Sequence, residues 1–164
     1  MYTASSTSHS PIIGWAWDGY PIYGPYGYTS AYDTSSAIKR ISSSYKLRSI
    51  TERTSLANGT VLSSYYYGPT INSSYPLGSY LEDYEYSAGY GDLDEYNGRW
   101  GYTPEYPSGT YAYFIPTNSS NMPAYPYTIG PYFYGSVGST NRYQTIPASA
   151  TKYFSYIWIK THNC

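Results

Sequence analysis

The sequence predicts a mostly β fold, namely a single compact, loop-rich antiparallel β domain with at most one or two short helices. Its 164 residues match the length of one ordinary domain that can bury a core. The stretch from His9 to Tyr28, HSPIIGWAWDGYPIYGPYGY, contains three Pro and four Gly. Because Pro fixes φ and withholds a donor while Gly permits positive φ, this backbone should turn repeatedly between short extended pieces.

The composition indicates a folded chain whose surface carries few charges. It has 27 Tyr and is 21% aromatic but only 12% charged, whereas ordinary soluble domains carry about 25% charged residues. A Tyr ring buries its face and leaves its hydroxyl to water or a partner. Disordered chains have few aromatic residues and a high net charge, and here the net charge is -1. The chain is therefore expected to fold.

The same numbers exclude several classes of protein. A near-neutral chain lacks the basic excess that nucleic acid binding needs, so no nucleic acid partner is expected. No apolar run approaches the roughly 18–20 residues of a membrane span. The N-terminus, MYTASSTSHS, has neither the basic region nor the apolar core of a signal peptide. A single cysteine, Cys164, cannot form an internal disulfide.

Turn residues divide the chain into short elements. Residues 12–17 are expected to be extended, Asp18-Gly19 to form a tight turn, and residues 20–28 to form a second strand that bends into a Gly/Pro corner. In chain order, the further elements expected are a short helix over 35–41 capped by Asp33 or Thr34, a strand over 45–50, a turn at Asn58-Gly59, and strands over 65–67, 111–115, 125–129 and 152–160.

Three segments differ from the rest of the domain, which spans residues 1–164. Residues 1–8 are rich in Ser and Thr and predict a loose lead or a strand completed by a neighbour. Residues 54–79, rich in Asn, Gly, Ser and Pro, predict a surface excursion. Residues 152–164 include KYFSYIWIK, which is apolar on both faces. This pattern predicts a central strand or one shared with a neighbouring subunit.

Charges are grouped along the chain. Residues 32–53 hold five of the nine basic residues, and residues 82–95 hold six of the ten acids. These two segments are expected to face each other, or to face successive copies in an assembly.

The aromatic stretch 9–28 also resembles the signature of YHYH-domain proteins, especially the version in virion structural proteins of T4-like cyanophages. The resemblance continues in order through YLEDYEY (80–86), GDLDEYNGRW (91–100), TPEYPSGTYAYF (103–114) and YPYTIG (125–130). It implies a phage tail or fibre component. The tetrad that names the family reads Tyr111-Ala112-Tyr113-Phe114 here, so chemistry that depends on its two histidines does not carry over.

Few residues offer catalytic or metal chemistry. The loop 92–98 has oxygens at calcium-like spacing, but it departs from an EF-hand loop at three positions, so a metal site is the minority alternative. His9, Ser10 and Asp18 suggest a hydrolytic trio, but adjacent strand residues point to opposite faces. A structural role is preferred, with Asp94 and Glu95 paired to Arg99. The predicted structural polar cluster comprises His9, Asp18, Asp94, Glu95, Arg99 and Glu105.

The aromatic residues exceed what one core can hide, and exposed flat rings are typical of binding surfaces. Sugars present C–H faces to such rings and hydroxyls to Tyr. The predicted binding surface comprises Trp15, Trp17, Tyr23, Tyr26, Tyr28 and Trp100. Candidate glycosylation sites in predicted loops are Asn58, Asn72 and Asn118.

Together these features predict a non-catalytic structural or adhesive module of an extracellular assembly, located on a virion or outside the cell. Its expected partners are further copies of the chain or a larger assembly, and a glycan receptor. No cofactor is expected. Two alternatives stay open: a subunit of a cellular extracellular fibril, and, from another class, a calcium-binding or hydrolytic domain.

Overall fold

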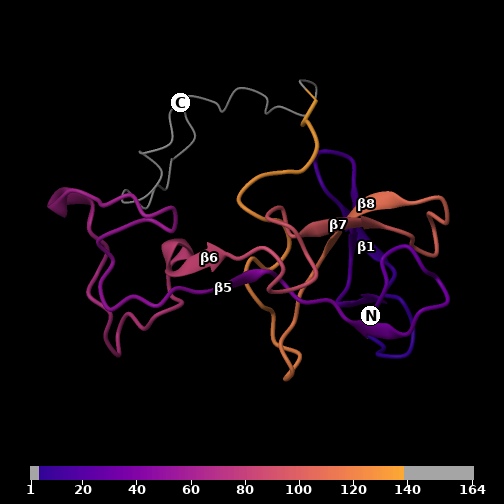
Figure 1. The fold of residues 1–164 in the computed structure, drawn as a ribbon, viewed down its shortest axis with the longest axis horizontal. Helices are drawn as coiled ribbons and strands as arrows, with labels where there is room; N and C mark the ends of the chain where they lie inside the picture. Colours follow the sequence, from indigo (N-terminus) through magenta and orange to yellow (C-terminus); the bar gives the residue numbers. More distant parts are fainter. Residues whose placement is uncertain (1–3, 139–164) are drawn as a thin grey trace, which may run out of the picture.

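A computed structural model describes residues 4–138 (Figure 1). The mostly β, loop-rich prediction is confirmed, and the helical elements among these residues are two short 3-10 helices. In chain order the elements are β1 (Ile12–Trp15), β2 (Pro21–Tyr23), β3 (Tyr26–Tyr28), β4 (Ile38–Arg40), β5 (Tyr45–Leu47), η1 (Ser64–Tyr66), η2 (Leu81–Asp83), β6 (Tyr84–Tyr86), β7 (Gly98–Gly101) and β8 (Thr110–Phe114).

A four-stranded sheet in the order β1-β2-β8-β7 forms the centre of the fold. The β1/β2 and β7/β8 pairs are antiparallel, as predicted, but β2 and β8 run parallel and join segments that lie far apart in the sequence. Two further pairs, β3/β4 and β5/β6, are small antiparallel sheets. In the described part of the chain, no helix has the length and apolar character that crossing a membrane requires.

The aromatic stretch folds much as its turn residues predict. Gly19 has φ 87 and donates its N–H to the Ala16 carbonyl, which closes the turn between β1 and β2. The Gly24-Pro25 corner then ends β2. Beyond it the chain enters a different sheet, so the single bent strand expected over 20–28 is two strands, β2 and β3.

The core consists of one cluster on each face of the four-stranded sheet. Alternation along β8 directs Tyr111 and Tyr113 to one face and Ala112 and Phe114 to the other. The first face carries the cluster of Ala16, Tyr111 and Tyr113, against which Tyr20, Ile22, Tyr96, Ile129 and Phe133 pack. The second carries the cluster of Tyr23, Ile41, Leu93, Ala112 and Phe114, with Ile12 against it.

Three predicted elements are wrong. The helix expected over 35–41 is absent because Asp33 Oδ1 accepts from the backbone N–H of Ser35 in a local turn (2.8 Å), and β4 then pairs with β3. The strand expected over 65–67 is instead the 3-10 helix η1. The strand expected over 125–129 is a series of turns, in which Tyr127 N–H bonds to the Ala124 carbonyl. The strand predicted over 152–160 lies outside the described residues.

The expectation that the basic and acidic segments face each other is confirmed within the chain. Three ion pairs connect them: Lys39 to Asp92 at 2.5 Å, Lys46 to Glu85 at 3.4 Å, and Arg53 to Asp83 at 2.7 Å.

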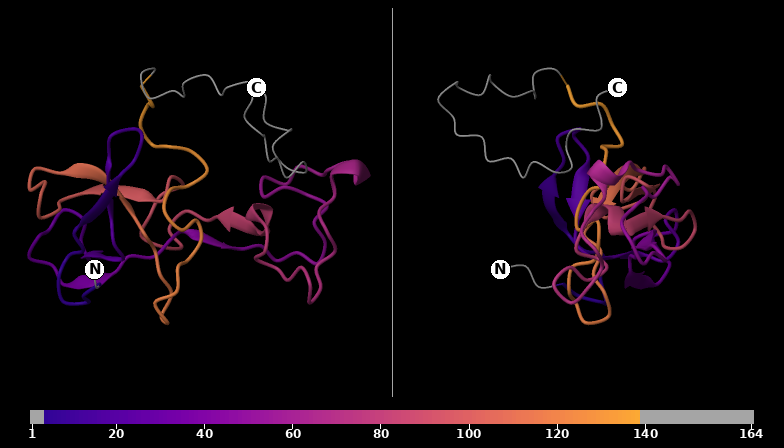
Figure 2. Two further views of the ribbon diagram at one scale, coloured as in Figure 1. Left: turned by 180° about the vertical axis from the view of Figure 1, so that it is seen from behind. Right: turned by 90° about the vertical axis from the view of Figure 1, so that its left-hand side faces the viewer.

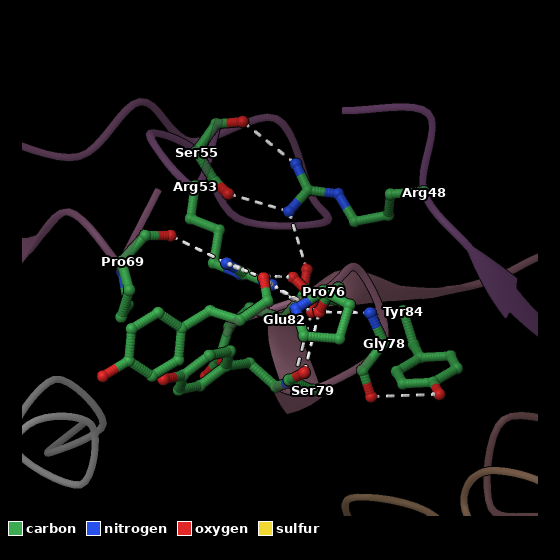
Figure 3. A network of polar contacts seen from close by, with 12 residues as sticks. Arg48, Arg53, Ser55, Pro69, Pro76, Gly78, Ser79, Glu82 and Tyr84 are labelled. Carbon is green, nitrogen blue, oxygen red and sulfur yellow. Dashed lines mark hydrogen bonds and ion pairs between the residues drawn. The ribbon is translucent and has the colours of Figure 1, made fainter. Parts of the chain in front are cut away.

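Residues 48–83, here called the arm, extend from the β5/β6 pair to one end of the molecule, away from the four-stranded sheet (Figures 1 and 2). They include the predicted surface excursion, 54–79. The arm is held by hydrogen bonds from two arginines (Figure 3). Arg48 donates to the carbonyls of Ser55, Leu56 and Glu82. Arg53 forms a two-pronged pair with Asp83, at 2.7 and 2.8 Å.

Candidate functional site

The three tryptophans of the predicted binding surface are exposed. Trp15 is 55% exposed, Trp17 49% and Trp100 46%. Trp100 donates its indole N–H to the Tyr134 hydroxyl at 2.9 Å, which fixes the direction of the ring. Aromatic rings that are held in place and half exposed are suited to contact a partner at low entropic cost.

Two of the three tyrosines assigned to the same surface are not available to a partner. Tyr23 is fully buried and Tyr26 is 8% exposed, so both belong to the interior, which corrects the prediction. Tyr23 stacks on Phe114 with centroids 5.7 Å apart. Its hydroxyl lies 2.8 Å from Thr103 Oγ1 and 2.9 Å from Glu105 Oε2. Tyr28 is half-buried, with its ring 5.0 Å from that of His9.

The two tetrad tyrosines donate hydrogen bonds to carboxylates. The hydroxyl of Tyr111 lies 2.9 Å from both oxygens of Asp94, and that of Tyr113 lies 2.6 Å from Asp18 Oδ2. Burial, together with the nearby carboxylate, raises the pKa of each phenol above its ordinary value. Both side chains therefore stay protonated, which suits structural donors and not bases or nucleophiles.

The expected pairing of Asp94 and Glu95 with Arg99 is wrong. Asp94 Oδ1 instead accepts from the backbone N–H groups of Tyr96 and Gly98, both at 3.0 Å, and so caps the turn. The Glu95 side chain is exposed. Arg99 lies on the other face of the four-stranded sheet from Tyr111, where it donates to the Tyr28 carbonyl at 2.7 Å.

Asp92 and Asp94, two carboxylates of the calcium-like loop 92–98, bind different partners. Asp92 binds Lys39 and Ser42, whereas Asp94 binds Tyr111. Asn97 uses its side-chain nitrogen to donate to the Phe114 carbonyl at 2.9 Å. Among residues 4–138, no group of three or more His, Cys, Asp and Glu could hold a metal ion.

His9 lies on the other face of the sheet from Asp18, so the predicted polar cluster is divided in two. Its Nδ1 donates to the Ser10 carbonyl at 2.7 Å, and its ring contacts Tyr23 edge to face at 5.0 Å. Burial lowers the pKa of His9, with the charge of Glu105 opposing this effect and that of Arg99 adding to it. Ser10 is 2% exposed, and its Oγ accepts from the Tyr26 N–H. The hydrolytic trio of His9, Ser10 and Asp18 is therefore not assembled.

The tetrad positions that are histidine in the resembled family are apolar here. Ala112 and Phe114 are each 1% exposed and pack with Ile41 and Leu93. The Arg99 guanidinium lies 5.3 Å above the Phe114 ring. This half of the tetrad therefore contributes packing and no titratable group.

An open cavity of about 570 Å³ lies beside the turn that joins β1 to β2. Its lining residues are Ala16, Trp17, Asp18, Gly19, Ser136 and Gly138. Trp17 and Asp18 are predicted site residues, whereas the other four are small residues that were not predicted from the sequence. Ser136 and Gly138 stand in a Gly/Ser-rich stretch with no motif that would have identified them. Tyr134 was also not predicted from the sequence. Its ring stacks on that of Tyr111 with centroids 3.8 Å apart.

The three candidate glycosylation sites are all exposed. In each, the Asn side-chain oxygen accepts a backbone N–H two residues on, which makes a local turn: Asn58 to Thr60, Asn72 to Ser74, and Asn118 to Ser120. Glycosylation at these positions stays a prediction.

Comparison with known protein families gives a match over most of the chain. The family described as "YHYH protein" matches residues 1–128, which include the aromatic stretch, the tetrad, and the carboxylates of Asp18 and Asp94. No curated protein and no solved structure matches the chain.

Proposed function

The chain belongs to the YHYH protein family, and from this premise we propose that it is a non-catalytic structural and adhesive module of an extracellular assembly, most specifically a phage tail or fibre component. The observation that carries the proposal is the exposure of three tryptophans, Trp15, Trp17 and Trp100, on a chain that is 12% charged. A surface of this kind contacts proteins or glycans through rings and not through charge.

The state of the reactive side chains supports the non-catalytic part of the proposal. Catalytic acids and bases need a pKa near the working pH. The pKa values of Tyr111 and Tyr113 are instead shifted further above neutral, and Ser10 is buried. Each of these groups contacts its own backbone or side-chain partner, and the tetrad contains no imidazole.

The experiment that tests the assembly part is a measurement of native mass by light scattering, with electron microscopy of the same sample. The purified chain should form a closed oligomer or a filament. A variant that lacks residues 152–164 should lose assembly if KYFSYIWIK completes the sheet of a neighbour. A cooperative thermal unfolding transition of this variant shows that the domain still folds. A monomer at every concentration would contradict the proposal.

A further inference from the structure

The cavity beside the β1/β2 turn combines a broad ring with a carboxylate. Trp17 contributes an indole that is 49% exposed, and Asp18 follows it directly in the chain. The remaining described lining residues, Ala16, Gly19, Ser136 and Gly138, are small. A flat apolar wall beside hydrogen-bonding groups is the usual composition of a site for a small polar ligand.

Asp18 is held in place but not fully used. Its Oδ2 accepts from the Tyr113 hydroxyl at 2.6 Å and from the Gly135 N–H at 2.9 Å. Its Oδ1 is buried and has no hydrogen-bond partner among the described residues. A buried acceptor without a donor costs free energy, so a ligand hydroxyl that reached this oxygen after a small rotation of the Asp18 side chain would recover that cost.

We propose that this cavity is a subsite for one pyranose ring of a neutral glycan, with the C–H face of the sugar against Trp17 and a sugar hydroxyl donating to Asp18. The inference deepens the adhesive part of the proposed function and rests on it. It commits to uncharged sugars because Asp18 repels anions and none of the described lining residues is cationic.

The arrangement of the sheet gives the site its rigidity. Tyr113 is fully buried in β8, and its hydroxyl both donates to Asp18 and accepts from the Tyr134 N–H at 2.8 Å. One tetrad tyrosine therefore positions the carboxylate and the segment 134–136 at the same time. Such support from behind the contacting groups lowers the entropic cost of binding.

The test uses the full-length chain on an array of neutral, sialylated and sulfated glycans, followed by titration of the best neutral oligosaccharide in a calorimeter. Trp17→Ala should weaken binding by at least about tenfold, as expected for loss of an aromatic anchor. Tyr65→Ala is the control, because Tyr65 is also an exposed aromatic residue but lies in the arm and does not line the cavity. It should bind within about twofold of the unmodified chain.

A second variant removes the negative charge of Asp18 but keeps the size of the side chain. Asp18→Asn should weaken binding of the same oligosaccharide while the melting temperature records any loss of the Tyr113 contact. The proposal is overturned if no neutral glycan binds, if only sialylated or sulfated glycans bind, or if Trp17→Ala and Tyr65→Ala behave alike. Light scattering separates this failure from failure of the proposed function, because a chain that assembles but binds no sugar contradicts the subsite alone.

Discussion

In the four-stranded sheet the side chains removed from water are mainly aromatic, whereas in the arm they are charged. Tyr23, Tyr111 and Tyr113 are fully buried in the sheet. Between residues 48 and 83 the buried residues are Arg48, Arg53 and Asp83, and every tyrosine of this segment is exposed or half-exposed. The two regions therefore reach a defined structure by different means.

The arm shows what replaces an apolar core. Arg53 donates to both oxygens of Asp83 and to the carbonyls of Pro69, Tyr75 and Pro76. Asp83 also accepts from the N–H groups of Gly78 and Tyr80 (Figure 3). Because each charge is fully hydrogen-bonded, the cost of burying it is offset, and the ion pair connects loop segments that make few apolar contacts.

The largest expected effect comes from breaking this pair on one side. Asp83→Ala leaves the Arg53 charge buried without its partner, which should cost about 3–5 kcal/mol. We expect the loss to be confined to the arm, so hydrogen exchange measured by mass spectrometry should rise in residues 54–79 and stay slow in β8. The double variant Arg53→Met with Asp83→Leu is the control, since it removes both charges and should lose less. Equal exchange in the two variants would contradict the role of the ion pair.

A smaller effect is expected from crowding the aromatic sheet. An added Cβ at Gly98 would lie 2.3 Å from the Tyr111 hydroxyl, and that ring is held by Asp94 and by stacking on Tyr134. Gly98→Ala should therefore cost about 1–3 kcal/mol in the free energy of unfolding, measured by denaturant titration. At Gly14 the nearest contact is 3.9 Å, so Gly14→Ala is the matched control in the same sheet. Equal losses would show that close packing at Tyr111 is not what stabilises the sheet.

The sequence predicted the local turns and the alternation of β8 well, because both depend on neighbouring residues. It failed where the outcome depends on distant partners. An Asp followed two residues on by Ser suits either a helix cap or a turn, and pairing of β4 with β3 decides between them at Asp33. Tyr-Pro-Tyr at 125–127 resembles an alternating strand, yet no neighbouring strand pairs with it among the described residues.

For the candidate site, composition predicted that aromatic rings are exposed but not which ones. Trp17 and Tyr23 have similar surroundings in the sequence, but Tyr23 meets Phe114 across the parallel β2/β8 pair. Asp94 and Arg99 are close in the chain, but β7 directs Arg99 to the opposite face from Tyr111. Faces of a sheet follow from strand pairing, and a parallel pair between residues about ninety positions apart leaves no local signal.

The same two regions should respond differently to acid. Burial lowers the pKa of His9 in the folded sheet. As the pH falls, the unfolded chain therefore binds a proton at His9 before the folded chain does, near the ordinary pKa of about 6.5. The stability that depends on neutral His9 is complete above that pH and is lost as the pH falls below it. For Asp83, burial acts to raise the pKa, but the bonds from Arg53, Gly78 and Tyr80 outweigh it and lower the pKa. Its contribution persists down to about pH 4 and is lost only as the pH falls further.

Lowering the pH from 7 to 5 should therefore weaken the sheet while the Asp83 contribution to the arm is unchanged, and this is the smallest of the three effects. The buried Nε2 of His9 has no acceptor for a second proton among the described residues, so protonation must be accommodated by opening the contact with Tyr23 and Phe114. Region-resolved hydrogen exchange, corrected for the intrinsic pH dependence, measures this directly. His9→Phe keeps a ring at the position and should flatten the response of the sheet between pH 7 and 5. If the sheet of His9→Phe still weakens as much as that of the unmodified chain, His9 is not the group whose protonation weakens the sheet.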